Sequence, residues 1–148
     1  MPGLDAKDVI DVQITVSGFS DDLLKPALGR AGFVYHAIVR DHTPPGMTLP
    51  PLDLEKRLLN PAEGRRANVH MRIEGRWNQR YPLLCRDYLR SHPDAANAYA
   101  EIKRQLARYF PSNSDAYYDI KDPVFDVIMA GAEDWARFTD WKPGASDA

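Results

Sequence analysis

Residues 9–16 read VIDVQITV, and this stretch decides the fold class because apolar and polar residues alternate along it. The apolar positions are Ile10, Val12, Ile14 and Val16, and the polar positions are Asp11, Gln13 and Thr15. Successive side chains of a strand point to opposite faces, so the alternation predicts a strand with one buried face and one polar face. Ser17 and Gly18 then end this strand.

Two further strands are expected along the chain. Residues 33–39 read FVYHAIV and predict a second strand, and residues 67–74 read ANVHMRIE and predict a third. In the third strand the inward side chains are Val69, Met71 and Ile73, and the outward ones are Asn68, His70 and Arg72. The proline-rich residues 40–66 between them predict a long loop with a turn of helix at 52–59.

Polar caps and prolines mark the starts of four expected helices. Their expected limits are Ser20 to about Ala31, Pro82 to about Arg90, Ser91 to Tyr109, and a last helix capped by Asp122 with Pro123 in its first turn. This order of elements predicts an α+β fold, in which a small mixed sheet is packed by helices on one side. We expect one domain over residues 1–142 and a frayed tail over 143–148.

The composition is typical of an ordinary globular protein of 148 residues. The net charge of −2 offers no broad attraction for nucleic acid or for acidic membranes. Cys85 is the single cysteine, so a disulfide framework is excluded. No apolar run has the length of a membrane span, and no secretion signal opens the chain, so the expected compartment is the cytoplasm.

Three stretches carry a family resemblance. They are LDAKDVIDVQITV, NVHMRIEGRWNQRYPLLCRDYLRSHPDAANAYAEIKRQLA, and AYYDIKDP with the later AEDWARFTDW. Together they resemble the GrpB family, whose fold is that of the nucleotidyltransferase superfamily. The most specific part is CRDYLRSHP followed by Tyr99, Lys103 and Leu106. The resemblance covers nearly the whole chain, and a similar domain occurs fused behind dephospho-CoA kinase in some bacteria.

The start of the chain departs from this family pattern. Related sequences typically read Gly-Ser-Thr-Ser-Val-Pro-Gly-Leu-Ala-Ala-Lys before the strand, whereas this chain keeps only Pro2, Gly3, Leu4 and Lys7. Either the start was misassigned or trimmed, or the chain is a degenerate copy without the phosphate-gripping Gly-Ser turn. Loss of the preceding strand predicts an open edge beside residues 9–16, covered by a homodimer or by the proline-rich loop.

Catalysis in the superfamily uses a strand bearing Asp-x-Asp or Asp-x-Glu, whose carboxylates hold Mg²⁺ against the nucleotide phosphates. Here the pair is Asp11 and Gln13, and the amide of Gln13 brings no charge. The resemblance therefore implies a degenerate motif, with Asp11 as the remaining metal ligand and catalytic residue. The alternative is that Asp11 is a solvated strand residue or a partner of Arg72.

Basic residues around the third strand and the following helix suggest an anion site, because guanidinium groups match phosphate in a planar fork. The expected substrate-binding residues are Gln13, Arg72, Arg76, Arg80, Arg86 and Lys121. The alternative is that the helix arginines, Arg90 included, are solvated or paired with carboxylates such as Asp87. His70 is a candidate general base or phosphate contact, and the alternative is a hydrogen-bonded structural histidine.

Three functional hypotheses remain open on the sequence. The first is a ligand-binding, vestigial family member in which a nucleotide or phosphorylated metabolite lies against Asp11, Gln13, His70 and Arg72. The second is an active, metal-dependent nucleotidyl or phosphoryl transferase that upstream residues or a partner chain complete. The third is a non-catalytic module that helps another domain to fold or assemble, as the kinase fusion suggests.

Overall fold

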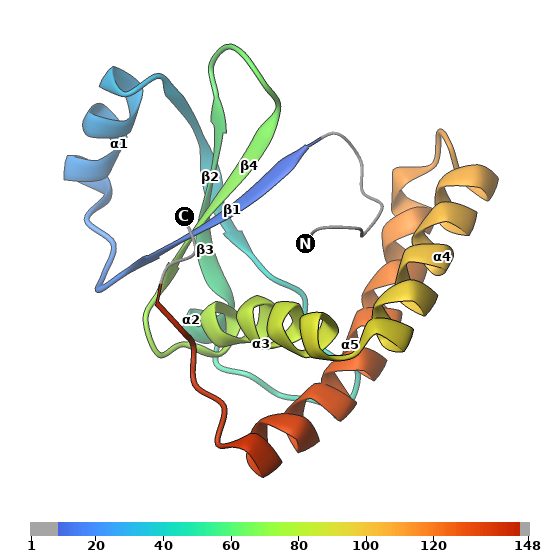
Figure 1. Ribbon diagram of the computed structural model, residues 1–148. Coiled ribbons are helices and arrows are strands. Elements are labelled where there is room, and N and C mark those ends of the chain that lie inside the picture. The colour runs from blue at the N-terminus through green and yellow to red at the C-terminus, as the bar shows by residue number, and fades with distance from the viewer. Residues whose placement is uncertain (1–8, 146–148) are drawn as a thin grey trace. The chain divides into compact units, whose positions relative to one another are not determined.

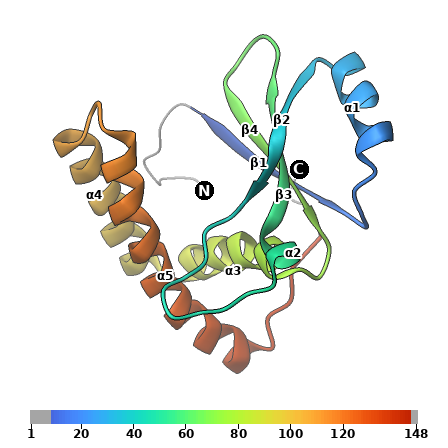
Figure 2. The same cartoon turned by 180° about the vertical axis from the view of Figure 1, so that it is seen from behind.

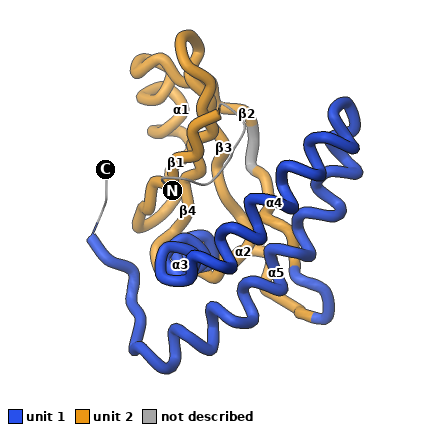
Figure 3. Tube along the Cα trace, turned by 45° about the vertical axis from the view of Figure 1, so that its right-hand side comes forward, with its two compact units in different colours: residues 1–6, 44–46, 80–148 blue, residues 7–43, 47–79 orange. Residues whose placement is uncertain are grey.

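The computed structural model describes residues 9–145 of the chain, and these form two compact units (Figures 1 and 3). Residues 9–43 and 47–79 make up the first, which we call the sheet unit. Residues 44–46 and 80–145 make up the second, which we call the helical unit. The motif residues at positions 2–7 and the end of the tail, at positions 146–148, lie outside the described residues. The prediction of a single domain over residues 1–142 stays a prediction.

A mixed sheet of four strands organises the described part of the sheet unit. The strands are β1 (Ile10–Val16), β2 (Phe33–Arg40), β3 (Glu55–Pro61) and β4 (Ala67–Ile73). Their order across the sheet is β1-β4-β3-β2, with β1 parallel to β4 and the other two pairs antiparallel. The predicted α+β class with a small mixed sheet is therefore confirmed.

Helix α1 (Asp21–Arg30) packs on one face of this sheet. Leu59, Val69 and Met71, from the two central strands, are buried at the centre of that face. The partly buried side chains packed against them are Val16, Phe19, Leu24, Leu28, Phe33 and Tyr35. The alternation in residues 67–74 thus predicted the inward face of β4 correctly, because period two sends every second side chain into the same layer. In β1 Val16 packs against this core, whereas Ile10, Val12 and Ile14 are 41%, 40% and 40% exposed and are not buried as predicted.

The proline-rich segment is the largest error of the sequence-based prediction. Only Pro51–Leu54 are helical, as α2, and residues 55–61, predicted to be helix or loop, form the central strand β3. The misleading signal is the run Glu55-Lys56-Arg57, which reads as exposed because charged residues are seldom buried. In the structure Arg57 is 4% exposed, and its Nε, Nη1 and Nη2 each donate to a carboxylate.

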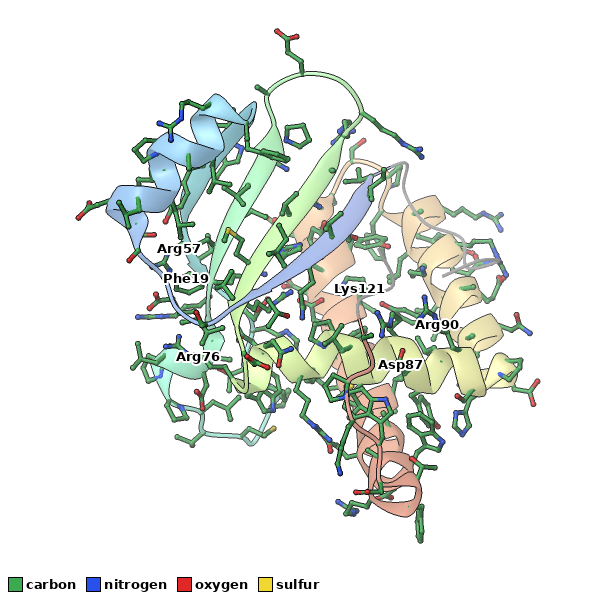
Figure 4. All side chains as sticks on the ribbon, turned by 60° about the vertical axis from the view of Figure 1, so that its left-hand side comes forward. Phe19, Arg57, Arg76, Asp87, Arg90 and Lys121 are labelled. Carbon is green, nitrogen blue, oxygen red and sulfur yellow. The ribbon has the colours of Figure 1, made fainter. Side chains whose placement is uncertain are left out.

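Arg57 lies on the α1 side of the sheet and is held by two carboxylates (Figure 4). Its Nε and Nη2 donate to Asp21 at 2.8 and 2.9 Å, and its Nη1 donates to Glu55 at 2.7 Å. The guanidinium carbon lies 4.0 Å from the centroid of the Phe19 ring, and the Tyr35 hydroxyl donates to Asp21 at 3.1 Å. These contacts attach the start of α1 to β3. We call Arg57, Asp21 and Glu55 the Arg57 network.

Helices α3 (Trp77–Ser91), α4 (Pro93–Tyr109) and α5 (Ser114–Thr139) follow the sheet. Helices α4 and α5 run side by side as a hairpin (Figures 1 and 2). The predicted helix starts are wrong in three places: Pro82 and Pro123 lie inside helices, and His92 rather than Ser91 precedes α4. Helix α5 begins nine residues before Pro123 because Asn113 caps it, accepting from the amide of Ala116 at 3.0 Å.

The helical unit has an aromatic and aliphatic core. The ring of Phe125 lies 5.2 Å from that of Tyr81 and 6.1 Å from that of Tyr99, measured between centroids. Cys85 is 2% exposed, and burial raises the pKa of its thiol to about 12. A buried thiol whose pKa is raised stays protonated at neutral pH and is therefore unreactive. No described helix is both long and apolar enough to cross a lipid bilayer.

Candidate functional site

The polar face of the sheet brings together the four residues from which the sequence predicts a site. Parallel pairing sets Asp11 beside Asn68 and Gln13 beside His70, with Arg72 two residues further along β4. Because all these positions have the same parity along their strands, their side chains share the face opposite the Leu59 core. The predicted juxtaposition of Asp11, Gln13, His70 and Arg72 is present in the structure.

Arg72 is the centre of this face, and its side chain is only 8% exposed. Its Nη1 donates to Oε1 of Gln13 at 2.8 Å. Its Nε and Nη2 donate to the two carboxylate oxygens of Asp41 at 3.1 and 3.0 Å, in a fork that matches the planar group. The sequence prediction did not include Asp41, which follows β2 directly.

Asp41 also binds two other groups. It accepts from the ammonium group of Lys56 and from Nδ2 of Asn78, the latter at 3.0 Å. Burial alone would raise the pKa of Asp41, but the hydrogen bonds and charge of Arg72 outweigh it and hold that pKa below the usual value of 3.8. Asp41 is therefore ionised at neutral pH.

We call Asp41, Lys56 and Arg72 the Asp41 cluster. It contains two cations and one anion, so it carries a net charge of about +1 at neutral pH. Burial lowers the pKa of Lys56, and the carboxylates of Asp41 and Asp11 oppose that shift only in part. The Lys56 side chain is 12% exposed, so its positive charge is poorly screened by water.

Gln13 joins this cluster to the first turn of α3. While its Oε1 accepts from Arg72, its Nε2 donates to the main-chain carbonyl of Gln79 at 3.0 Å. The side chain of Gln79 donates back to the hydroxyl of Thr15 at 3.3 Å. A carboxylate at position 13 would lose the donor that faces the Gln79 carbonyl. The side-chain amide of Gln13 is therefore hydrogen-bonded through both its oxygen and its nitrogen.

Asp11 and His70 form the outer part of the polar face. The Asp11 carboxylate accepts from Nδ2 of Asn68 at 3.0 Å and lies 3.9 Å from Nε2 of His70. The side chain of Asp11 is 71% exposed, whereas that of His70 is 20% exposed. Nδ1 of His70 is buried, with no hydrogen-bond partner in the described part of the chain. A group that binds here would meet a carboxylate and an imidazole on adjacent strands.

The residues around Asp11 provide few ligands for a metal ion. Among residues 9–145 there is no group of three or more His, Cys, Asp or Glu side chains that could hold a metal. Asp41, the nearest carboxylate partner of Arg72, is already engaged by two cations. Mg²⁺ usually takes one or two carboxylates and otherwise water or phosphate oxygens. The metal role of Asp11 stays a prediction.

The remaining basic candidates contact groups of their own unit. In the sheet unit Nη1 of Arg76 donates to the main-chain carbonyl of Leu52 at 2.6 Å. In the helical unit the pairs are Arg80 with Glu133, Arg86 with Asp87, Arg90 with Asp87, and Lys121 with Asp122. Figure 4 shows Asp87 beside Arg90. The structure thus gathers Arg72 with Lys56 and engages the helix arginines with carboxylates, as the alternative interpretation expected.

Comparison with known proteins places the chain in a family. The family model described as GrpB protein matches residues 1–131. The chain belongs to the GrpB family. Its structure resembles the crystal structure of GrpB from Enterococcus faecalis, with a TM-score of 0.66 and 28% identity, over 88% of this chain and 73% of that one. The predicted resemblance to the GrpB family is confirmed.

Two relatives show in which proteins such sequences occur. A protein named dephospho-CoA kinase from Mycolicibacterium paratuberculosis is 36% identical over 96% of this chain, which spans 38% of that protein. A UPF0157 protein from Pseudomonas aeruginosa is 35% identical over 89% of this chain, which spans 51% of that protein. This GrpB chain therefore spans 38% of the length of one of these relatives and 51% of the other.

Proposed function

We propose that this GrpB protein binds a nucleotide or a phosphorylated metabolite on the polar face of its sheet unit, without ordinary nucleotidyl transfer. The observation that carries the proposal is the net positive charge of the Asp41 cluster. Two cations share one carboxylate, and the third acceptor of Arg72, Gln13, is neutral. An incoming phosphate would supply the negative charge that this poorly solvated cluster lacks.

Side chains beside the Asp41 cluster are suited to contact the organic part of such a ligand. Asn68 and His70 offer an amide and an imidazole beside the exposed carboxylate of Asp11. The partnerless Nδ1 of His70 is a hydrogen-bonding atom that a ligand or a water molecule would satisfy. We infer that phosphate binds towards Lys56 and Arg72 and that the organic part of the ligand lies towards Asp11 and His70.

Catalytic transfer has weaker support. Asp11 is the single carboxylate at the expected metal position, and the neighbouring Gln13 is committed to Arg72 and Gln79. Loss of one carboxylate weakens Mg²⁺ binding and the stabilisation of charge on the transferred phosphoryl group. The alternative, an active metal-dependent transferase completed by upstream residues or by a partner chain, predicts turnover that Asp11→Ala abolishes.

Calorimetric titration of the chain with ATP, with ADP and with pyrophosphate, each with and without Mg²⁺, tests the proposal. We expect at least one of them to bind, and Lys56→Met to weaken that binding about tenfold, because the cluster loses its extra positive charge. Arg104→Met, which removes an exposed cation paired with Glu101 on α4, is the matched control and should bind normally. If none of the three binds, or if both variants weaken binding equally, the proposal is wrong.

The kinase relatives favour a second candidate function. Because this chain matches 38% of the length of a protein named dephospho-CoA kinase, a GrpB-like segment exists alongside other sequence in that protein. A non-catalytic module that helps a neighbouring domain to fold or assemble would need neither metal nor substrate. Refolding yield of that kinase with and without its GrpB-like segment measures this role. An unchanged yield would exclude the role for that relative.

A further inference from the structure

Strand β1 is the terminal strand of the sheet in the described part of the chain. Its aliphatic side chains are incompletely covered: Ile10, Val12 and Ile14 are 41%, 40% and 40% exposed. The strand has seven residues in regular alternation, without proline, glycine or lysine. Apart from the charge of Asp11, β1 lacks the charges, prolines and bulges with which proteins usually protect an edge strand from pairing with another chain.

The main-chain groups of β1 fall into two sets. The amide of Ile10 donates to the carbonyl of Arg66 at 3.0 Å, and the carbonyl of Val16 accepts from the amide of Glu74 at 2.9 Å. In a parallel pair the residues of one parity bond to the neighbouring strand, so the even-numbered residues of β1 bond to β4. The amides and carbonyls of Gln13 and Thr15 therefore point away from β4, towards the open edge.

We propose that two copies of this chain pair through β1, antiparallel and related by a two-fold axis at Gln13. In this register Gln13 lies opposite itself, and the two residues exchange both main-chain hydrogen bonds as an antiparallel hydrogen-bonded pair. Thr15 of each copy lies opposite Asp11 of the other, again with the outward-pointing main-chain groups facing each other. The two four-stranded sheets then form one continuous sheet, and the interface is isologous.

The side chains of β1 are complementary to themselves in this register. On the α1 face Ile10 lies opposite Val16 of the second copy, and Val12 lies opposite Ile14. On the polar face the charge of Asp11 meets the hydroxyl of Thr15, so no like charges face each other. A shift of one residue would place Val12 of one copy opposite Gln13 of the other. The outward main-chain groups of the two copies would then no longer face each other, and apolar side chains would lie beside polar ones.

The opposite edge of the sheet is less suited to pairing. Strand β2 carries a bulge between Tyr35 and Ala37, which interrupts its register with β3. Bulges twist an edge and disrupt regular pairing, and this protects β2. Among the described strands, the contrast between a regular β1 and an irregular β2 favours a closed dimer through β1 over an open chain of molecules.

Sedimentation equilibrium of the chain across a range of protein concentrations tests the dimer. We expect twice the mass of one chain for the wild type and for Thr15→Val. We expect the mass of one chain for Thr15→Pro, which removes an outward amide but leaves the even-numbered residues bonded to β4. Both variants lose the threonine hydroxyl, but only Thr15→Pro also loses the main-chain N–H group at position 15. A wild type that stays monomeric up to several hundred micromolar would overturn the proposal.

Disulfide trapping tests the register even if Thr15→Pro does not fold. Val12 and Ile14 of opposite copies form a non-hydrogen-bonded pair, in which Cα atoms lie about 4.5 Å apart, within the range of a disulfide. A mixture of Val12→Cys and Ile14→Cys chains should therefore cross-link on oxidation, while each variant alone should remain largely uncross-linked. The native Cys85 is 2% exposed and should not react. A mixture that cross-links no better than the single variants would exclude this register.

Discussion

Arg57 and Arg72 lie on the adjacent strands β3 and β4, on opposite faces of one sheet, and are bound in nearly the same way. Each donates two hydrogen bonds to the carboxylate of one aspartate, Asp21 or Asp41. Each donates a third to a side-chain oxygen from its own face, which belongs to Glu55 for Arg57 and to Gln13 for Arg72. Both arginine side chains are less than a tenth exposed.

The networks differ in net charge. Two carboxylates surround Arg57, so the Arg57 network carries about −1. This network therefore offers no excess positive charge that would attract an anion to the α1 side of the sheet. Arg72 has one carboxylate and the neutral Gln13, and Lys56 adds a second cation, so the Asp41 cluster carries about +1. One network attaches a helix to the sheet, and the other leaves a positive charge on the candidate ligand-binding face.

The largest expected effect is that of Arg57→Met on stability. Without the guanidinium group, Asp21 and Glu55 lose the cation between them, and burying a broken ion pair costs about 3–5 kcal/mol. We expect the free energy of unfolding to fall by this amount in urea titrations. The triple variant Arg57→Met, Asp21→Asn, Glu55→Gln removes the charges together and should recover part of the loss. If the triple variant is no more stable than the single one, charge is not the cause.

Arg72→Met should destabilise the chain less, by about 1–3 kcal/mol, which is the cost of leaving hydrogen-bonding groups unpaired. Asp41 keeps Lys56 and Asn78 as partners, whereas Oε1 of Gln13 loses its donor. The same urea titration measures the difference from Arg57→Met. Equal losses in the two variants would contradict the view that Lys56 supports Asp41.

Gln13→Glu adds one negative charge beside the Asp41 cluster and so brings the net charge of this group of side chains close to zero. One added negative charge beside Arg72 should weaken binding of the nucleotide or pyrophosphate about tenfold in the absence of Mg²⁺. The substitution also restores an Asp-x-Glu pair with Asp11, so an active transferase would instead bind Mg²⁺-nucleotide more tightly. Calorimetry with and without Mg²⁺ separates the two outcomes, and Gln105→Glu on α4 is the control for an added charge.

Acid should destabilise the wild type through both networks. The hydrogen bond from Arg57 is the main cause that lowers the pKa of Asp21 below 3.8, and the pKa of Asp41 is lowered as well. The folded chain therefore binds fewer protons than the unfolded chain just below pH 4, so stability falls as pH falls through that window. Arg57→Met should lose stability less steeply there. Urea titrations at pH 3 to 6 measure these slopes.

The smallest expected effect is that of Lys56→Met on stability. Burial lowers the pKa of Lys56, so holding its charge costs free energy at neutral pH, while Asp41 keeps the fork of Arg72. We expect the free energy of unfolding to change by less than about 1 kcal/mol. Together with the expected loss of ligand binding, this would assign Lys56 to function rather than to folding. A loss as large as that of Arg72→Met would assign it to the fold.

Local alternation predicted much of the sheet and the polar face. Asp11 and Gln13 on one strand, and His70 and Arg72 on another, are marked by aliphatic neighbours of the opposite parity, and adjacent pairing brings the four together. Alternation does not predict which residue, distant in the sequence, pairs with a given polar side chain. Asp41 and Lys56 come from a segment interpreted as loop, and nothing local distinguishes them from solvated charges.

The same reason explains the misassigned strand. Residues 55–61 carry three successive charges, and only the fold shows that Glu55 and Arg57 bond on one face while Lys56 serves the other. The helix starts failed for a different reason. Pro82 and Pro123 resemble start signals, but hydrogen bonds within a long helix tolerate one missing donor when packing fixes the segment. The burial of a salt bridge and the extent of a long helix both depend on contacts between residues that are far apart in the sequence.

The division between the two units falls inside α3, between Gln79 and Arg80, although the helix is continuous from Trp77 to Ser91. Gln79 is tied to β1 twice, through its carbonyl to Gln13 and through its amide to Thr15. Any displacement of β1 must therefore be taken up by the first turn of that helix. Gln79 therefore links the geometry of β1 to the start of α3 within the sheet unit itself.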